Sequence, residues 1–183
     1  MLKSAQMRGQ RTPKKLDADG LWGYSLKLLG GRALSTGEVR QKLARRAEKD
    51  TDVEAVIAKL RDYGYLNDHK FAESYASWRK ENEGFGKMRV LRDLRQRRVA
   101  PTLADEAVER AFKDSDEIEQ IQAFLARKFR NVNLGELLQE DKKLQSAYRK
   151  LRYAGFSSGA AIRVLKRYAD KADQLEDDPA DDE

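Results

Sequence analysis

The sequence contains no cysteine and only one histidine, His69, among its 183 residues. Without thiols the chain can form neither disulfides nor thiolate metal sites, and a lone histidine does not supply the convergent ligands that zinc needs. No apolar run approaches the roughly 18 residues of a membrane span, and residues 1–10 hold no apolar signal-peptide core. We therefore expect a cytoplasmic protein with no metal, no cofactor and no membrane partner.

Strand signals are also scarce. The chain has three prolines, no alternating runs of β-branched residues and no Asn-Gly turn, which are the usual signs of strands and hairpins. Only 40% of the residues are hydrophobic and 37% are charged, which favours a core divided among several small units over one thick core. The absence of strand signals predicts an all-α fold.

Charge is what the sequence has in abundance, and its distribution is uneven. Residues 170–183 hold eight acids and one lysine, a net charge of −7. Because the whole chain carries +6, residues 1–169 carry +13. We expect two disordered tails, a basic one over 1–19 and an acidic one over 170–183. The remaining 20–169 still carry +10, which favours a polyanionic partner such as nucleic acid, although a positive charge can also serve solubility alone.

Helix starts can be predicted from capping residues. Ser35 followed by Glu38 fits a capping box, and Thr51 followed by Glu54 repeats the spacing. Pro101 suits the first turn of another helix, and Ser115 or Asp116 precedes a further apolar stripe. These signals predict nine short helices of roughly 10 to 16 residues.

An internal repeat emerges when the helical segments are compared. Five apolar residues recur as apolar residues after a constant shift of 57 positions: Leu94, Val99, Leu103, Ala107 and Val108 match Leu151, Phe156, Ala160, Val164 and Leu165. The simplest division is three tandem three-helix repeats, residues 20–66, 67–113 and 114–169. Such repeats contact mainly their neighbours, so we expect an elongated, curved, right-handed helical body.

The segment from Tyr63 to Tyr75 is predicted to be a junction between repeats. Gly64 lies where the preceding helix must stop, and a glycine there adopts the left-handed conformation easily. Asn67 would cap the next helix and Asp68 would face its positive end. Leu66 and Phe71 then stand at the two positions of a hydrophobic staple. His69 falls in the first turn near solvent, which is a more ordinary place for a histidine than a metal site.

At this point the sequence resembles the RecX family of recombinase regulators. The resemblance rests on three motifs in order: RALSTGEV at 32–39 with Leu43, GYLND at 64–68 with Phe71, Ala72 and Tyr75, and GFG at 84–86 with Val90 and Leu94. It covers residues 24–112 well and 118–168 more weakly. One departure is Arg98, which stands before Val99 where members often have glycine, so that helix is expected to end without a glycine cap.

The resemblance implies a modulator, usually an inhibitor, of the RecA recombinase in recombination and the SOS response. It also implies a helical body that lies in the groove of the RecA filament on single-stranded DNA. Such binding would limit filament growth, ATP hydrolysis and strand exchange. The implied partners are the RecA filament and single-stranded DNA, with duplex DNA as a further option. We expect a monomer without an active site.

Catalytic motifs are missing from the sequence. Gly84-Phe85-Gly86-Lys87 has neither the spacing nor the Ser or Thr of a phosphate-binding loop, and no nucleophile-base pair can be assembled from spacing. Basic clusters are the informative chemistry. The residues predicted to bind a polyanion or the filament are Arg89, Arg92, Arg95, Arg97, Lys150, Arg152 and Lys166.

The predicted binding residues, the acidic tail and the overall function each allow a second interpretation. Segment 87–98 places Arg89 and Arg92 opposite its apolar stripe, but Asp93 could instead pair with Arg89 and Arg97 at four-residue spacing. The acidic tail could reach back and compete with DNA for the basic surface. Two rival functions are a free-standing helical DNA-binding transcriptional regulator, which would need a helix-turn-helix, and an adaptor that binds only protein.

Overall fold

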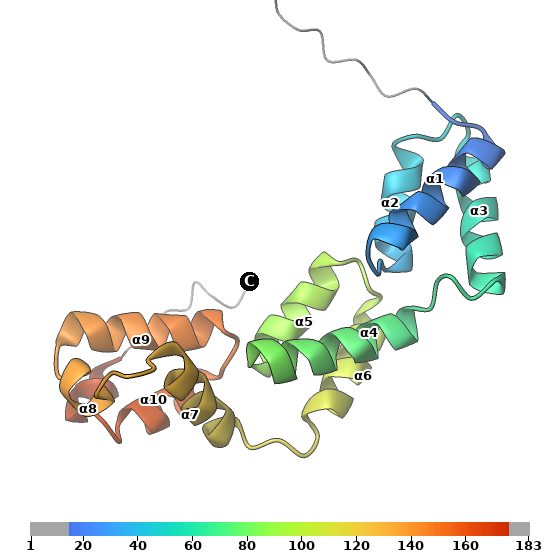
Figure 1. Cartoon of the computed structure of the whole chain (residues 1–183). Coiled ribbons are helices and arrows are strands. Elements are labelled where there is room, and N and C mark those ends of the chain that lie inside the picture. Colours follow the sequence, from blue (N-terminus) through green and yellow to red (C-terminus); the bar gives the residue numbers. More distant parts are fainter. Residues whose placement is uncertain (1–14, 176–183) are drawn as a thin grey trace, which may run out of the picture. The chain divides into compact units, whose positions relative to one another are not determined.

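The computed structural model describes residues 15–175, and their secondary structure is helical apart from one isolated bridge (Figure 1). The all-α class is confirmed. The α-helices are α1 (Ala18–Gly31), α2 (Thr36–Ala44), α3 (Asp50–Asp62), α4 (Asp68–Trp78), α5 (Lys87–Gln96), α6 (Pro101–Phe112), α7 (Glu117–Lys128), α8 (Leu134–Leu137), α9 (Asp141–Tyr153) and α10 (Ser158–Leu165). A π-helix, η1 (Arg79–Glu83), continues α4, and a 3₁₀-helix, η2 (Asp170–Gln174), follows α10. None of the described helices is long and apolar enough to cross a membrane.

The chain divides into two compact units at Asn67 and Asp68. The first unit consists of α1, α2 and α3 around a core that includes Leu21, Leu43 and Leu60, all fully buried. Leu16 pairs in parallel with Ala47 through two backbone hydrogen bonds, Leu16 N to Arg46 O (2.7 Å) and Glu48 N to Leu16 O (2.9 Å). The last residues of the expected basic tail, 15–19, are thus held by this bridge and by the start of α1; residues 1–14 lie outside the described residues.

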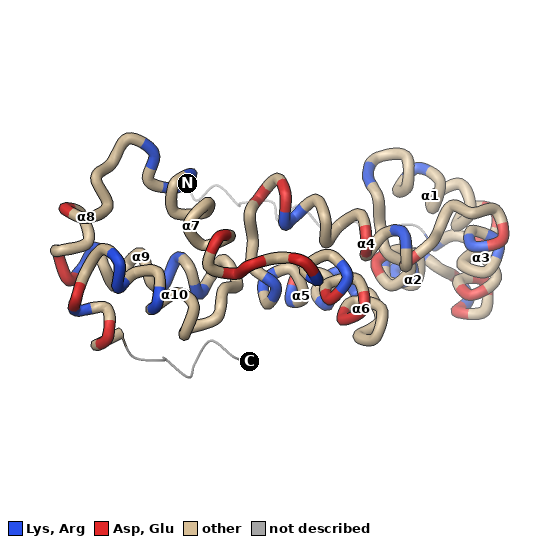
Figure 2. The backbone as a smooth tube through the Cα atoms, turned by 90° about the horizontal axis from the view of Figure 1, so that it is seen from below, with Lys and Arg blue, Asp and Glu red and all other residues tan. Residues whose placement is uncertain are grey.

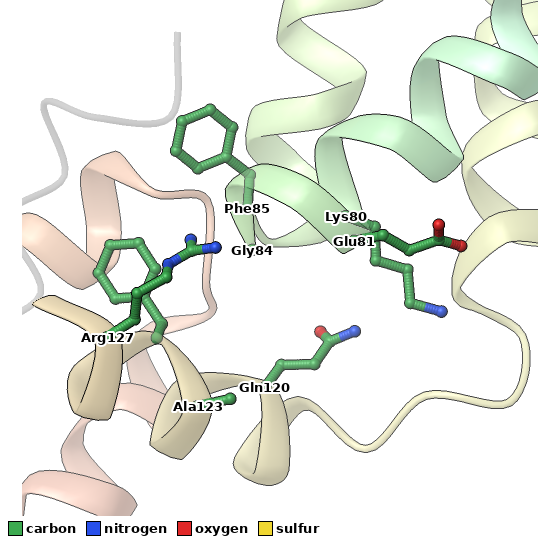
Figure 3. Close-up of a pocket in the computed structure, with 8 residues that line it drawn as sticks. Lys80, Glu81, Gly84, Phe85, Gln120, Ala123 and Arg127 are labelled. Atoms are coloured by element: carbon green, nitrogen blue, oxygen red, sulfur yellow. The ribbon is translucent and has the colours of Figure 1, made fainter.

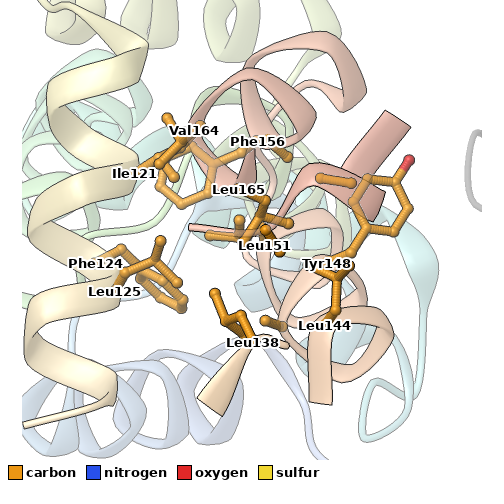
Figure 4. Close-up of a cluster of buried hydrophobic side chains, with 14 of the residues drawn as sticks. Ile121, Phe124, Leu125, Leu138, Leu144, Tyr148, Leu151, Phe156, Val164 and Leu165 are labelled. Atoms are coloured by element: carbon orange, nitrogen blue, oxygen red, sulfur yellow. The ribbon is translucent and has the colours of Figure 1, made fainter. Parts of the chain in front are cut away.

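The second unit has two cores. The middle group, α4 to α6 with η1, surrounds Val90, Leu94 and Val108. The C-terminal group, α7 to α10 with η2, surrounds a larger cluster whose side chains point toward one another in Figure 4. Phe85, in the loop between η1 and α5, packs against both cores and so joins the two groups.

The boundaries in the C-terminal group differ from the prediction in two ways. The group contains an additional one-turn helix, α8, because Asn133 caps it through a hydrogen bond from Gly135 N (3.1 Å). The chain also stays ordered beyond residue 169. Residues 170–174 form η2, and Ala172 is fully buried in the C-terminal core. The start of the segment expected to be a disordered acidic tail is therefore folded, and residues 176–183 lie outside the described residues.

The predicted helix starts are correct where a cap binds locally. Ser35 and Glu38 form both hydrogen bonds of the capping box, at 3.0 and 3.1 Å, and Asp116 accepts from Ile118 N at 2.7 Å. Pro101 is the first residue of α6. The prediction for Thr51 is wrong, since α3 begins at Asp50 and leaves Thr51 inside its first turn.

Three helix ends share one backbone arrangement. Gly64 (φ 73°), Arg98 (φ 59°) and Gly155 (φ 91°) all adopt positive φ. In each case a later N–H returns to a leucine carbonyl five or six residues back: Leu66 N to Leu60 O (3.3 Å), Val99 N to Leu94 O (3.2 Å) and Phe156 N to Leu151 O (3.2 Å). Arg98 therefore performs a glycine's role without being glycine, which resolves the departure noted in the sequence.

Burial also follows the 57-residue shift. Four of the five residue pairs are buried on both sides, and the fifth pair, Leu103 and Ala160, is partly buried on both sides. The division into three repeats stays a prediction, as does the curved shape, which concerns how the units are arranged.

Candidate functional site

The strongest cluster of polar chemistry in the second unit surrounds Asp93 on α5. Its carboxylate accepts from Arg79 Nε at 3.0 Å and also binds Arg79 Nη2. Arg89 Nε lies 3.1 Å from the other carboxylate oxygen. The side chains of Asp93, Arg79 and Arg89 are only 7%, 19% and 18% exposed, so three charged groups share an environment with little water.

Aromatic rings extend this cluster into a ladder. The guanidinium of Arg79 lies 4.7 Å from the ring centre of Phe85 and 5.4 Å from that of Tyr75. That of Arg89 lies 5.4 Å from Phe85 and 4.4 Å from Tyr153 on α9. Such cation–π contacts stabilise a charged guanidinium that has lost water. We call Arg79, Phe85, Arg89, Tyr153 and Asp93 the cation–aromatic ladder, and it links the middle group to the C-terminal group.

The ladder keeps Arg89 charged. A hydrogen bond to the Tyr153 side chain raises the pKa of Arg89 above the ordinary arginine value, and the nearby Asp93 carboxylate adds to the rise against the opposing effect of burial.

The prediction that Arg89 points outward is wrong, because its side chain is only 18% exposed. α5 has its own core on one side, but the C-terminal group covers part of the side that a helical wheel assigns to solvent. The alternative pairing of Asp93 with Arg89 is the one that forms.

The other predicted basic residues are found in varied settings. Arg95 is exposed and lies 3.3 Å from Asp105, and Lys166 pairs with Asp173. Lys150 is exposed, with its Nζ 5.1 Å from the Phe129 ring centre. Arg92 and Arg97 are half-buried, and Arg97 faces the Tyr75 ring at 4.8 Å. Arg152 donates to Phe156 O at 2.9 Å. Their role as polyanion contacts stays a prediction; Figure 2 shows Lys and Arg recurring along α5, α9 and α10.

Two glycines allow the middle and C-terminal groups to meet backbone to backbone. Gly86 N donates to Ala154 O at 2.8 Å, and Met88 N donates to Gly155 O at 3.2 Å. The carbonyls that end α9 thus satisfy free N–H groups at the start of α5. A Cβ on Gly86 would lie 2.6 Å from Gly155 C, and one on Gly155 would lie 2.8 Å from Arg89 Cα. No other residue fits this close approach without a shift.

A second contact between these groups involves Arg127 on α7. Its Nη1 donates to Asn82 O at 2.8 Å, and a Cβ on Gly84 would lie 2.6 Å from its Nη2. Beside it a pocket of about 280 Å³ opens between η1 and α7 (Figure 3). Its polar lining residues are Lys80, Glu81, Gln120 and Arg127. Among residues 15–175 no group of three or more His, Asp or Glu side chains could hold a metal ion.

In the first unit, three aromatic residues form a surface cluster that the sequence reasoning missed. The ring centres of Trp22, Tyr63 and Tyr65 lie 5.8 to 6.4 Å apart, and Lys59 Nζ lies 4.4 Å from the Trp22 ring centre. Tyr63 and Tyr65 are exposed. The spacing of Tyr63 and Tyr65 on either side of Gly64 signals that both rings avoid the core, but nothing local indicates that Trp22 on α1 joins them.

The predicted junction residues are divided between the two units. Asp68 is the first residue of α4, so Asn67 stands at its N-cap position, and His69 is exposed as expected. Leu66 packs in the core of the first unit, whereas Phe71 packs against the middle core and stacks on Tyr75 at 5.9 Å. The Leu66–Phe71 staple stays a prediction.

Comparisons with known proteins identify the family. Residues 22–60 match the model of the first three-helix domain of RecX, and residues 67–108 match that of the second. A regulatory protein RecX from Bacillus velezensis is 31% identical over 178 residues, which cover 85% of this chain and 64% of that protein. One from Streptomyces coelicolor is 28% identical over 142 residues, 78% of this chain and 73% of the relative.

The chain belongs to the RecX family. These two relatives are named as regulatory proteins, and membership of a family of regulatory proteins agrees with the expectation that the chain is not an enzyme. The fold is shared with solved RecX structures. That from Lactobacillus salivarius has a TM-score of 0.61 at 18% identity and covers 82% of this chain and 96% of its own. A second RecX structure has a TM-score of 0.59 at 21% identity, covering 80% and 70%.

Proposed function

We propose that this RecX family protein acts in the bacterial cytoplasm as a regulator of RecA. It binds the RecA filament on single-stranded DNA and limits filament growth, ATP hydrolysis and strand exchange. The observation that carries the proposal is the match to both RecX three-helix domains in the expected order. The chain spans 64% of the length of the Bacillus velezensis relative. We therefore propose the activity for this chain and do not transfer it from the longer relative.

The charge of the chain supports the same proposal. Residues 20–169 carry +10, and the single-stranded DNA of the proposed partner carries a negative phosphate at every nucleotide. Long-range attraction of this kind raises the association rate and weakens with salt. A regulator that acts by steric and electrostatic contact needs neither a cofactor nor a catalytic site.

The structure divides the predicted contact residues by accessibility. Arg95, Lys150 and Lys166 are exposed, so we propose these three as the main residues that meet the filament. The predicted contacts Arg92, Arg97 and Arg152 are half-buried, so we propose a smaller contribution from each. Arg89 has little exposed surface and is held by Asp93 and Tyr153, so we assign it a supporting position in the ladder.

Co-sedimentation with preformed filaments tests the proposal. The chain is mixed with RecA filaments on single-stranded DNA held by a slowly hydrolysed ATP analogue, with RecA alone and with DNA alone. We expect the chain to pellet with the filament at concentrations where it does not pellet with either component. A protein that pellets only with DNA, and protects a specific duplex sequence without RecA, would instead be the transcriptional regulator. A chain found in the pellet of neither DNA nor filament would contradict both functions.

A further inference from the structure

A groove between α7 and α9 combines aromatic surface with positive charge. It encloses about 560 Å³, which lies within the roughly 300–1,000 Å³ of typical ligand sites. The residues that line it are Phe85, Phe124, Lys128, Ser146, Arg149, Lys150, Tyr153 and Ala154. Three of these are cations and none is acidic. The groove therefore suits a ligand that carries both negative charge and flat apolar surface.

The sequence of α9 explains why these side chains face the same way. Ser146, Arg149, Lys150 and Tyr153 stand at positions i, i+3, i+4 and i+7, which share one face of a helix. Phe124 and Lys128 have the same four-residue relation on α7. The buried residues of α9, such as Leu144 and Leu151, point into the C-terminal core instead. The helix thus presents two cations and a ring to the groove without weakening its core.

Tyr153 is unusual because it is both exposed and held in place. Its side chain is among the large apolar groups left at the surface, at 63% relative exposure. Arg89 stacks on the ring at 4.4 Å, and Arg89 itself is fixed by Asp93 and by the Phe85 ring. A ring that is already ordered loses little conformational entropy when it stacks on a ligand.

We propose that this groove binds single-stranded nucleic acid, with a base stacked on Tyr153 and phosphates on Lys128, Arg149 and Lys150. Bases stack on protein rings only when their faces are free, which selects single strands over duplexes. The proposal deepens the proposed function, since it locates a DNA contact of a filament regulator. It can still be tested without RecA.

Fluorescence anisotropy with labelled oligothymidylate, and with an oligomer of equal length in which abasic sites replace the bases, tests the stacking. We expect the wild-type chain to bind the base-bearing strand more tightly. Tyr153→Ala should weaken that binding roughly 5- to 150-fold, the factor that corresponds to loss of about 1–3 kcal/mol of stacking, and should leave the abasic strand nearly unaffected. Tyr153→Trp should retain the preference for bases.

A matched control is Tyr63→Ala in the first unit, because Tyr63 is 65% exposed and equally large. It should leave both affinities unchanged.

Since Tyr153 also contacts Arg89, a second variant avoids the ladder. Ser146→Glu adds an acid to the groove on the same face of α9, and it should weaken binding of both oligomers without affecting Arg89.

The charge contribution is tested by salt dependence. Replacing Arg149 and Lys150 together with Gln should reduce the slope of log affinity against log salt by about 1.4, since each phosphate contact to a single strand contributes about 0.7. The control is the same double replacement at Arg163 on α10 and Arg167 just after that helix, which are both exposed and do not line the groove. That control should leave the slope much closer to the wild-type value.

Three results would overturn the groove assignment: equal affinity for base-bearing and abasic strands, tighter binding of duplex than of single strands, or loss of affinity in the Tyr63→Ala control equal to that in Tyr153→Ala. Displacement of the oligomer by polyglutamate as readily as by unlabelled DNA would indicate an acidic protein segment as the occupant. If oligomers bind as expected while filaments do not bind the chain, the proposed function fails and the groove stands. If filaments bind the chain but the base-bearing and abasic oligomers bind equally, the groove assignment fails and the proposed function stands.

Discussion

Replacing Asp93 with Asn removes the carboxylate that neutralises Arg79 and Arg89 while keeping the shape of the side chain. Both guanidinium groups would stay in surroundings where they are less than a fifth exposed. Breaking a buried ion pair from one side costs about 3–5 kcal/mol. Because each arginine retains some contact with water and its ring partners, we expect a loss of about 3 kcal/mol, near the lower end of that range.

Thermal unfolding followed by circular dichroism measures this loss. For a chain of 150–250 residues, 1 kcal/mol corresponds to about 2–4 °C in Tm, so Asp93→Asn should lower Tm by about 6–12 °C for the transition that involves the second unit. The matched control is Asp105→Asn on the neighbouring helix α6. Its pair with Arg95 is about half exposed on both sides, and exposed pairs contribute only about 0–1 kcal/mol.

Equal small decreases in Tm for Asp93→Asn and Asp105→Asn would show that the Asp93 carboxylate contributes no more than an exposed one. A double variant adds a second check. Arg89→Met in the Asp93→Asn background should recover part of the lost stability, because it removes one of the two unpaired charges. No recovery would mean that Asp93 acts through packing and not through charge.

Four further expectations concern single positions and the tail. Gly155→Ala should unfold or detach the C-terminal group in urea titrations, because its φ of 91° and the nearby Arg89 backbone leave no room for a Cβ; normal stability would contradict the glycine contact. Arg98→Gly should stabilise by about 0.5–1 kcal/mol, since Arg98 is exposed and strained at φ 59°; a loss would mean that its side chain has a role. The hydrogen bond from Arg40 lowers the pKa of Glu54, so the pair's stabilisation is present above the unfolded pKa of about 4.3 and lost as pH falls through the lower folded pKa. NMR titration should show a higher Glu54 pKa in Arg40→Gln than in the wild-type chain, although Arg61 still lowers it slightly. Deleting residues 176–183, which carry six acids and no base, should raise affinity for single-stranded DNA at low salt and not at high salt, as measured by anisotropy; equal affinity at low salt would rule out competition.

Local signals made much of the fold predictable. The capping box of Ser35 and Glu38, the proline that begins α6 and the positive φ of Gly64 all depend on residues within a few positions of one another. Of the apolar residues that recur after 57 positions, Ala107 and Val108 on α6 and Val164 and Leu165 on α10 are buried. Thr51 shows the limit of such signals. A capping pattern that can begin one residue earlier does not fix the start of a helix.

The candidate site was less predictable because its contacts are distant in sequence. Arg79 and Asp93 are 14 residues apart, and Tyr153 comes from a helix of the C-terminal group. Helical spacing assigned Arg89 to solvent, and only packing of the Gly86 loop against Gly155 brings Tyr153 over it. Nothing local in the sequence indicates that the small size of Gly86 and Gly155 lets two backbones touch.

Regulation of RecA by this chain can be measured directly through the DNA-dependent ATPase of RecA. The chain is added at substoichiometric amounts to RecA that is hydrolysing ATP on single-stranded DNA, and the Asp93→Asn variant, kept at a temperature where it is folded, serves as a comparison. We expect ATP hydrolysis to slow as the chain is added, because filament growth is blocked. An ATPase rate that does not change, even at equimolar chain, would contradict regulation of RecA by this chain.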